Sequence, residues 1–293
     1  MELTFPRTGQ VRIACEPMSE IYSQRYDREG LRIGELICRR TRDRAVVSES
    51  ASRWEIVFVR RGAFTIEMAG RMWLATANQM LFLAPGRPYR ISHPTSLGDQ
   101  CTVAAIESAR FTEWMERLEV SDELSRSLFE RVCILVPATA YLAQDALLAA
   151  GDDAEGFVID TLGTAIGTVA APGTCGRGDA IRLDSRHRRI VQDVQERIVL
   201  ELAWSTPLAA IARDAGVSMF YLSRLFRSHT GCTIHQYRIR TRLREAFARL
   251  RQGESDLTML ALDLGFSDHS HFTNAFRREF GAAPSTWRSL LLR

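Results

Sequence analysis

The sequence predicts an α+β protein of two domains: an N-terminal antiparallel β-barrel with flanking helices, and an all-α C-terminal domain with two helix-turn-helix units. Its 293 residues exceed one ordinary domain. Short β-prone runs alternate with turns between residues 52 and 107, and a helix-turn-helix pattern occurs twice after residue 200. We expect domains at 1–171 and 188–293, joined by a linker over 172–187.

The strands of the predicted barrel are apolar runs separated by turn residues. Turns are expected at Arg61-Gly62, Ala69-Gly70 and Pro85-Gly86. The strands expected around them are Trp54–Arg60, Phe64–Met68, Met72–Ala75, Met80–Ala84 and Cys101–Ile106. The candidate contacts for a small-molecule effector are aromatic and aliphatic residues of this region: Trp54, Ile56, Phe58, Phe64, Ile66, Trp73, Phe82 and Tyr89. A plain hydrophobic core is the commoner role of such residues.

From Ser121 to Val169 the apolar spacing becomes helical. Amphipathic helices beside a barrel favour contacts in a homodimer, and packing onto their own barrel explains the pattern equally well. The segment Pro172–Asp179, PGTCGRGD, then breaks the periodicity with three glycines and a proline. It is the best candidate for the linker.

The cysteines and histidines of the first domain do not form a sequence pattern for metal binding. The six cysteines are too widely spread to form a metal-binding pair, so we expect reduced thiols: Cys15, Cys38, Cys101, Cys133, Cys175 and Cys232. A redox role for Cys175 stays open. His93 is the one histidine of residues 1–180, which removes the usual histidine-based metal site of barrel enzymes, although a carboxylate-based site stays open. We expect His93 to be a surface or structural histidine, and we expect no metal and no cofactor.

Charge is unevenly distributed along the chain. Residues 181–293 carry 18 arginines against 11 acidic residues, a net charge of +7, whereas residues 1–180 carry −4. The basic half is the candidate for a polyanionic partner. No stretch approaches the roughly 20 apolar residues of a membrane span, and Met1–Gln10 has no apolar core of signal-peptide length. We therefore expect a cytoplasmic protein without membrane contacts.

The two helix-turn-helix copies lie about 49 residues apart. In the first, Thr206-Pro207 opens a helix over Leu208–Ala215, Gly216 makes the turn, and Ser218 caps a second helix that ends at Gly231. In the second, a helix over Leu257–Leu264 is followed by Gly265, by Ser267 as cap, and by a helix over Asp268–Phe280.

Equivalent residues recur inside both copies. Ala212 and Ala261 each lie four residues before the turn glycine, where a small side chain lets two helices approach closely. The second helices bury matching positions, which are Leu222, Leu225 and Phe226 in one copy and Phe272, Ala275 and Phe276 in the other. Between the copies, Tyr237–Leu250 contains neither Gly nor Pro, which predicts a connecting helix.

These residues carry a resemblance to the AraC family of transcription regulators. The run GFSDHSHFTNAFRREFGAAPSTWR, Gly265–Arg288, resembles the signature of that family, and GVSMFYLSRLFRSHTG, Gly216–Gly231, resembles its first helix-turn-helix. The resemblance covers residues 188–293 and implies binding to double-stranded promoter DNA, contact with RNA polymerase and a role as a ligand-responsive activator. The N-terminal region resembles the family's cupin-like sensing domain. Ile234 and Asn274 depart from the family's usual proline and arginine.

The faces opposite the buried positions are the candidates for DNA contact. The first recognition helix presents Met219, Phe220, Ser223, Arg224 and Arg227, and the second presents His269, Ser270, His271, Thr273, Asn274 and Arg277. Arg224 can donate two hydrogen bonds to guanine, and Asn274 can pair with adenine. Contacts with phosphates outnumber contacts with bases in such interfaces, so phosphate binding is the competing role of each residue.

Enzymatic functions fit this sequence less well. Asp268, His269 and Ser270 are adjacent on one helix and do not face one another, so they form no local catalytic triad. We therefore expect no enzyme activity. Two alternatives stay open: a cupin-type enzyme fused to a DNA-binding module, and a DNA-repair regulator with a zinc-held methyl-acceptor cysteine.

Overall fold

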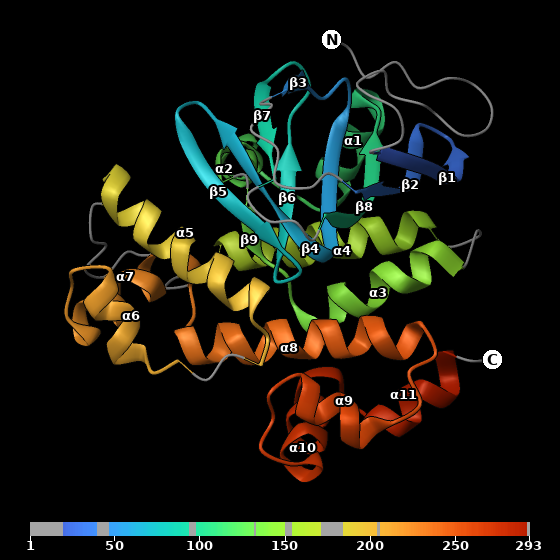
Figure 1. Ribbon diagram of the computed structural model, residues 1–293. Helices are drawn as coiled ribbons and strands as arrows, with labels where there is room; N and C mark the ends of the chain where they lie inside the picture. Colours follow the sequence, from blue (N-terminus) through green and yellow to red (C-terminus); the bar gives the residue numbers. More distant parts are fainter. Residues whose placement is uncertain are drawn as a thin grey trace. The chain divides into compact units, whose positions relative to one another are not determined.

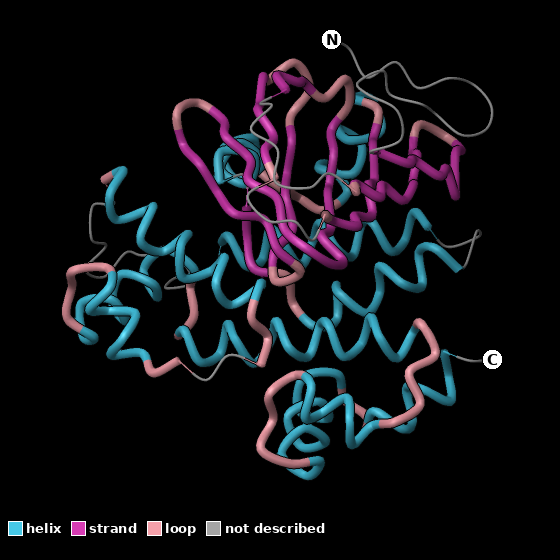
Figure 2. Tube along the Cα trace, viewed as in Figure 1, coloured by secondary structure: helices cyan, strands magenta, loops and turns pink. Residues whose placement is uncertain are grey.

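Strands and helices are segregated along the chain, with every described strand in the first of two compact units, Met1–Cys175, and only helices in the second, Gly176–Arg293 (Figures 1 and 2). The computed structural model describes residues 20–39, 47–93, 98–131, 133–149, 154–170, 184–203 and 206–291. Cys15, Cys175 and most of the predicted linker lie outside these residues.

The first unit is built on one antiparallel sheet with the strand order β1-β2-β8-β4-β6-β9, to which β5 and β7 add along β4, and β3 along β7. The strands are β1 Glu20–Arg28, β2 Leu31–Cys38, β3 Val47–Ser50, β4 Trp54–Met68, β5 Arg71–Thr76, β6 Gln79–Leu83, β7 Pro88–Ser92, β8 Asp99–Ile106 and β9 Cys133–Leu135.

The sheet is open, so the prediction of a closed barrel is wrong. Its outer strands β1 and β9 do not pair with each other. The predicted turn at Arg61-Gly62 is also wrong, because β4 continues through it with an irregular register between Val59 and Arg61. The first half of β4 pairs with β6 and β8, and its second half with β5 and β7. The irregularity lies just before Gly62, which itself pairs with Asp99 of β8, so the glycine stands inside a strand next to a bulge and not in a turn.

Four helices follow β8, with β9 between the second and the third: α1 Ser108–Arg117, α2 Asp122–Arg131, α3 Ala138–Ala149 and α4 Ala154–Ala170. Aromatic contacts show which face of the sheet they cover. The Trp54 ring of β4 stacks on Phe111 of α1 with centroids 4.2 Å apart, and Phe58 of β4 lies 6.4 Å from Phe157 of α4. Side chains alternate along a strand, so Val57 points to the opposite face. That face carries a separate buried cluster, whose members include Val57, Val59, Phe64, Ile66, Leu81, Tyr89 and Cys101.

The second unit contains seven helices among its described residues. They are α5 Ser185–Leu200, α6 Leu208–Asp214, α7 Met219–Thr230, α8 Ile234–Arg251, α9 Leu257–Asp263, α10 His269–Phe280 and α11 Pro284–Leu291. The helices α6–α7 and α9–α10 are the two predicted helix-turn-helix units, and α8 is the predicted connecting helix (Figure 1). No helix of the described chain is both long enough and apolar enough to cross a membrane.

Two predicted helix caps differ from the structure by one residue. Asp268, not Ser267, caps α10, because the Asp268 carboxylate accepts a hydrogen bond of 2.7 Å from the His271 backbone N–H. Pro207, not Thr206, occupies the cap position of α6, where no side chain makes a capping bond. The predicted cap Ser218 is confirmed, because its side chain accepts a bond from the backbone N–H of Tyr221. Asp184 caps α5 in the same way and accepts from the backbone N–H of His187. A run of two capping residues, such as Ser267-Asp268, leaves the cap ambiguous in sequence.

Candidate nucleic-acid interface

The same packing scheme holds both helix-turn-helix units together. The small residues Ala212 and Ala261 are buried where α6 meets α7 and α9 meets α10. The predicted inward faces are confirmed, since all six residues are at most 3% exposed: Leu222, Leu225, Phe226, Phe272, Ala275 and Phe276. Both recognition helices end on a glycine in the left-handed conformation, Gly231 at φ +78° and Gly281 at φ +80°. Burial of these faces leaves the opposite faces of α7 and α10 exposed.

Each unit is also tied to the helix before it by an equivalent ion pair. Asp214 at the end of α6 accepts from Arg197 of α5 at 3.2 Å. Asp263 at the end of α9, 49 positions later, accepts from Arg249 of α8 at 3.3 Å. These pairs are partly exposed and contribute little energy. Their recurrence shows that the repeat includes the preceding helix as well as the two helices of each unit.

The helix α8 fixes one unit relative to the other through Arg242. The Arg242 Nε donates to the Leu202 carbonyl oxygen at 2.7 Å, and Nη1 donates to the Gly265 carbonyl oxygen at 2.7 Å. The Arg242 guanidinium thus joins the end of α5 to the turn of the second helix-turn-helix unit. Burial lowers the pKa of Arg242 to about 10. Nearby, Gln195 of α5 donates to the Tyr237 hydroxyl of α8 at 3.1 Å.

The outward face of α7 is apolar at its beginning and basic along its length. All five predicted contact residues are exposed, with Met219 at 50% and Phe220 at 73%. The Arg224 guanidinium lies over the Phe220 ring, 5.9 Å from its centroid, so the two side chains support each other on the helix surface. The Ser223 hydroxyl donates to the Met219 carbonyl oxygen at 2.8 Å, which leaves its oxygen as an acceptor.

The outward face of α10 is polar, and one of its six predicted residues, Thr273, differs from the expectation. Five are exposed as predicted: His269, Ser270, His271, Asn274 and Arg277. Thr273 is half-buried and its hydroxyl oxygen is buried, so only part of this side chain reaches the surface. His271 is exposed, but its Nδ1 lies 3.1 Å from the Ser267 hydroxyl and its ring packs against Phe266 with centroids 5.4 Å apart. These contacts fix the imidazole of His271 at the beginning of α10.

Two histidines of this domain are held neutral by their surroundings. Burial lowers the pKa of His229, near the end of α7, to about 4, and the positive charge of Arg188 lowers it further. Burial also lowers the pKa of His235 at the beginning of α8, and Arg238 adds to the effect. Neither of these two histidines therefore adds positive charge to the domain near neutral pH.

The eight candidate effector contacts do not form one group. Trp54, Phe58 and Phe82 contact helices, with the Phe82 ring 5.8 Å from that of Phe129 in α2, and Ile56 shares their face of β4. Phe64, Ile66 and Tyr89 belong to the cluster on the opposite face, against which the partly buried Trp73 packs. Residues on opposite faces of a sheet cannot line one site. The alternation of side chains along β4 could have shown from the sequence that these residues lie on two faces.

Comparison with known proteins places the C-terminal domain. The family model for a helix-turn-helix domain matches residues 211–289. The regulatory protein SoxS of Salmonella typhimurium is 34% identical over 105 residues, which are 36% of this chain and 98% of SoxS. The transcriptional activator RhaS of Escherichia fergusonii is 34% identical over 101 residues, which are 34% of this chain and 35% of RhaS. Among solved structures, ToxT from Vibrio cholerae covers 90% of this chain and 100% of its own at 10% identity and a TM-score of 0.36, a similarity too low to support an inference.

Two helix-turn-helix units, each with an exposed recognition helix and joined by one helix, define a double helix-turn-helix DNA-binding protein. The chain belongs to the AraC/XylS family of DNA-binding transcription regulators. The resemblance inferred from Gly216–Gly231 and Gly265–Arg288 is therefore confirmed. The cupin-like character of the first unit stays a prediction.

Proposed function

We propose that this regulator is an effector-responsive activator that places α7 and α10 in two successive major grooves of promoter DNA. The observation that carries the proposal is the pair of exposed recognition faces joined by α8. This helix has 18 residues, which corresponds to about 27 Å at 1.5 Å per residue. Successive major grooves on one face of DNA recur about every 34 Å, so helices separated by a connector of this length suit two neighbouring grooves.

The proposed base contacts follow from the chemistry of the two faces. On α7, Arg224 suits guanine, and Met219 or Phe220 suits the methyl group of thymine. On α10, Asn274 suits adenine, while Arg277 suits a phosphate. The two elements of the binding site should therefore differ in sequence. Activation, with contact to RNA polymerase, is proposed because the relative RhaS is named as an activator.

The first unit is proposed to sense an effector and to dimerise the protein, with residues 1–171 as this domain, 172–187 as the linker and 188–293 as the DNA-binding domain. Only one face of the sheet can contribute effector contacts away from the helices, which limits the candidates to Phe64, Ile66, Trp73 and Tyr89. The helices α2–α4 are the proposed dimer contacts. The protein acts where promoter DNA lies, in the cytoplasm.

A regulator without enzyme activity is the favoured function, because SoxS is a regulatory protein of nearly the same length as the matched region. The cupin-type enzyme fused to a DNA-binding module would instead turn over a small molecule.

The test is DNA binding by two fragments. SoxS consists almost entirely of the matched region, so residues 181–293 should bind promoter DNA alone, and residues 1–170 should not. Gel-shift titration with genomic promoter fragments measures both. Equal binding by residues 1–170 would overturn the assignment. Sedimentation of the same N-terminal fragment tests the dimer, and a fragment that stays monomeric while the full chain dimerises would reject it.

A further inference from the structure

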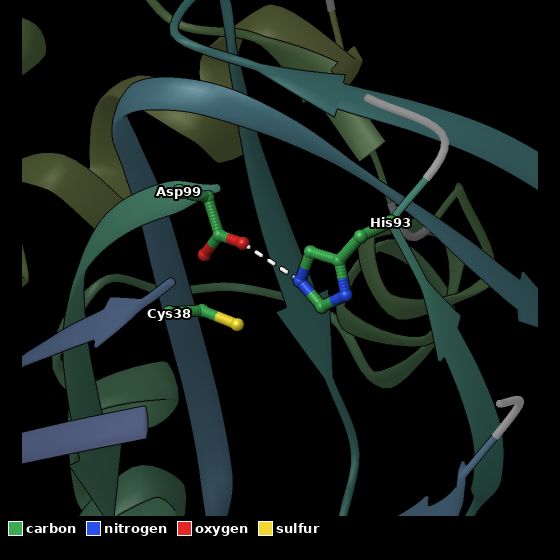
Figure 3. A group of neighbouring side chains, drawn as sticks. All are labelled: Cys38, His93 and Asp99. Atoms are coloured by element: carbon green, nitrogen blue, oxygen red, sulfur yellow. Dashed lines mark hydrogen bonds and ion pairs between the residues drawn. The ribbon is translucent and has the colours of Figure 1, made fainter. Parts of the chain in front are cut away.

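Three side chains that can ligate a metal ion converge in the first unit. Cys38 ends β2, His93 directly follows β7, and Asp99 begins β8 (Figure 3). All three are at most 5% exposed, and their ligand atoms lie within 4.8 Å of one another. His93 Nε2 is 2.9 Å from Asp99 Oδ1, and the Cys38 sulfur points toward the same place (Figure 3).

The strand register holds this arrangement. Cys38 is paired directly with Asp99 between β2 and β8, so their side chains project from the same face as neighbours. Gly98, at φ +64°, lies so close to β2 that a Cβ added to it would be 2.3 Å from the Cys38 carbonyl oxygen. The backbone at the site is therefore tightly packed, and it presents the ligand atoms in a fixed geometry.

A fourth donor atom lies beside the cluster. Cys101 follows Asp99 by two positions on β8, so both side chains lie on the same face, and the Cys101 thiol donates to Asp99 Oδ2 at 3.4 Å. Cys101 is 1% exposed and belongs to the apolar cluster of Val59 and Phe64. The Phe64 ring lies 6.5 Å from the His93 ring, so apolar groups border the site.

We propose that Cys38, His93 and Asp99, with Cys101 as fourth ligand, form a structural site for one Zn²⁺ ion. Sulfur and imidazole donors together with one carboxylate suit zinc, whereas calcium and magnesium require sites built from oxygen. A tetrahedral zinc site separates its ligand atoms by about 3.3–3.7 Å, so Cys38, His93 and Asp99 need only small side-chain movements. The Cys101 sulfur lies outside this group of three and must turn farther to complete the site. Binding would displace the thiol protons of Cys38 and Cys101.

A buried histidine–aspartate pair without a metal is the competing explanation. It accounts for the 2.9 Å contact of His93 with Asp99 and for the thiol bond of Cys101, but it does not call for the Cys38 ligand atom within 4.8 Å of those of both His93 and Asp99. A metal bound by all four would join β2 and β8 to the end of β7, and four protein ligands would leave no open position for catalysis. Counting histidines in the sequence missed this site, because its residues are 55 and 6 positions apart and only one is a histidine.

The experiment uses the full-length protein, purified with a non-chelating reductant, freed of metal with a chelator and titrated with Co²⁺ and with Zn²⁺. We expect one equivalent of either metal per chain, with an absorption band from thiolate to cobalt and the intense visible bands of tetrahedral cobalt. Zinc should also raise the thermal midpoint of unfolding. Cys38→Ser and Asp99→Asn should each weaken binding at least about tenfold, since even loss of an outer-shell partner costs about 10–100-fold.

Cys133→Ser is the matched control, because Cys133 lies in β9 of the same N-terminal unit and is not one of the four proposed ligands. This variant should keep the stoichiometry and the spectrum. The proposal is overturned if the wild-type protein takes up less than a tenth of an equivalent, if its cobalt complex lacks the thiolate band, or if Cys133→Ser loses binding as Cys38→Ser does. The wild-type spectrum alone decides the matter if Cys38→Ser fails to fold.

Discussion

The two helix-turn-helix units share a backbone plan but differ in chemistry at several exposed positions and at the N-terminal cap of the recognition helix. Recognition helix α7 is capped by neutral Ser218 and presents an aromatic and basic face, whereas α10 is capped by charged Asp268 and presents histidine, serine and asparagine. Near the end of the recognition helix, the first helix-turn-helix unit has the half-buried His229 where the second has Glu279, which accepts from Arg244 at 3.0 Å.

This difference shows which positions the fold requires and which it leaves to function. The buried alanines, the buried recognition-helix faces and the terminal glycines are the same in kind in both units, because they determine how two helices pack. The outward side chains touch little within the domain, so they can diverge without a change in fold. Two unequal faces on one chain are suited to an asymmetric DNA site.

The largest expected difference concerns the two turn glycines. Both have positive φ, +67° at Gly216 and +74° at Gly265, but a Cβ at Gly265 would lie 2.7 Å from Ala203 Cα, whereas the nearest atom at Gly216 is an arginine nitrogen at 3.8 Å. Gly216→Ala should cost about 1–2 kcal/mol from the left-handed backbone alone. Gly265→Ala adds overpacking and should cost about 3–5 kcal/mol. Denaturant unfolding of the C-terminal fragment measures both, and equal costs would refute the close contact at Gly265.

His229 should make the stability of the first helix-turn-helix unit sensitive to acid. Burial holds the pKa of His229 at about 4 in the folded state against about 6.5 for an ordinary histidine, so the unfolded state binds more protons between these values. The stability of the unit is full above about pH 6.5 and falls as the pH drops toward 4, by up to about 3 kcal/mol. His229→Gln should remove this loss. Unfolding at several pH values decides it, and an unchanged pH dependence in the variant would show that another group is responsible.

The outward faces of α7 and α10 should each determine the base preference of a different DNA element. Arg224→Ala should relax preference in one DNA element only, and Asn274→Ala in the other, each at a cost of about 1–3 kcal/mol for the preferred base. Binding-site selection and footprinting with each variant measure this. Arg277→Ala serves as a control for a general phosphate contact and should weaken all sequences alike. If Arg224→Ala and Asn274→Ala also weaken all sequences uniformly, they contact phosphates and base readout lies elsewhere.

The sequence predicted the helical C-terminal domain far better than the N-terminal sheet domain, for a physical reason. The elements of the helix-turn-helix units are set by local signals, such as the cap at Ser218 and the glycine at Gly231, and each signal occurs twice. The errors there were small, as with Ser267 and Asp268, where two adjacent residues are both good caps. In the predicted interface, the buried hydroxyl of Thr273 and the local contacts of His271, Arg224 and Ser223 required coordinates.

The sheet depends instead on pairing between distant residues. The strands β1 and β2 lie before residue 52, outside the region where strands were predicted. Most residues of β1 are polar, so its sequence lacks the apolar run by which the other strands were predicted. The course of β4 through Gly62 and the convergence of Cys38 on Asp99 are set by register, which a single sequence does not reveal. The same dependence separated the candidate effector residues onto two faces.

The smallest expected effect distinguishes the two caps. The backbone N–H of His271 lowers the pKa of Asp268, and the Ser267 hydroxyl lowers it further, because both donate hydrogen bonds to the charged carboxylate. The cap of α10 is therefore at full strength above the ordinary aspartate pKa of about 3.9 and is lost as the pH falls through the lower value of the folded state. Ser218 does not titrate, so the cap of α7 persists. Amide hydrogen exchange between about pH 5 and pH 3, below the ordinary range of histidine, should show the first turn of α10 opening more readily as the pH falls. Asp268→Asn keeps an acceptor oxygen without the charge, and it should remove the pH dependence of α10 while leaving the first turn of α7 unchanged. If both first turns lose protection together, acid opens the domain as a whole and the charged cap makes no separate contribution.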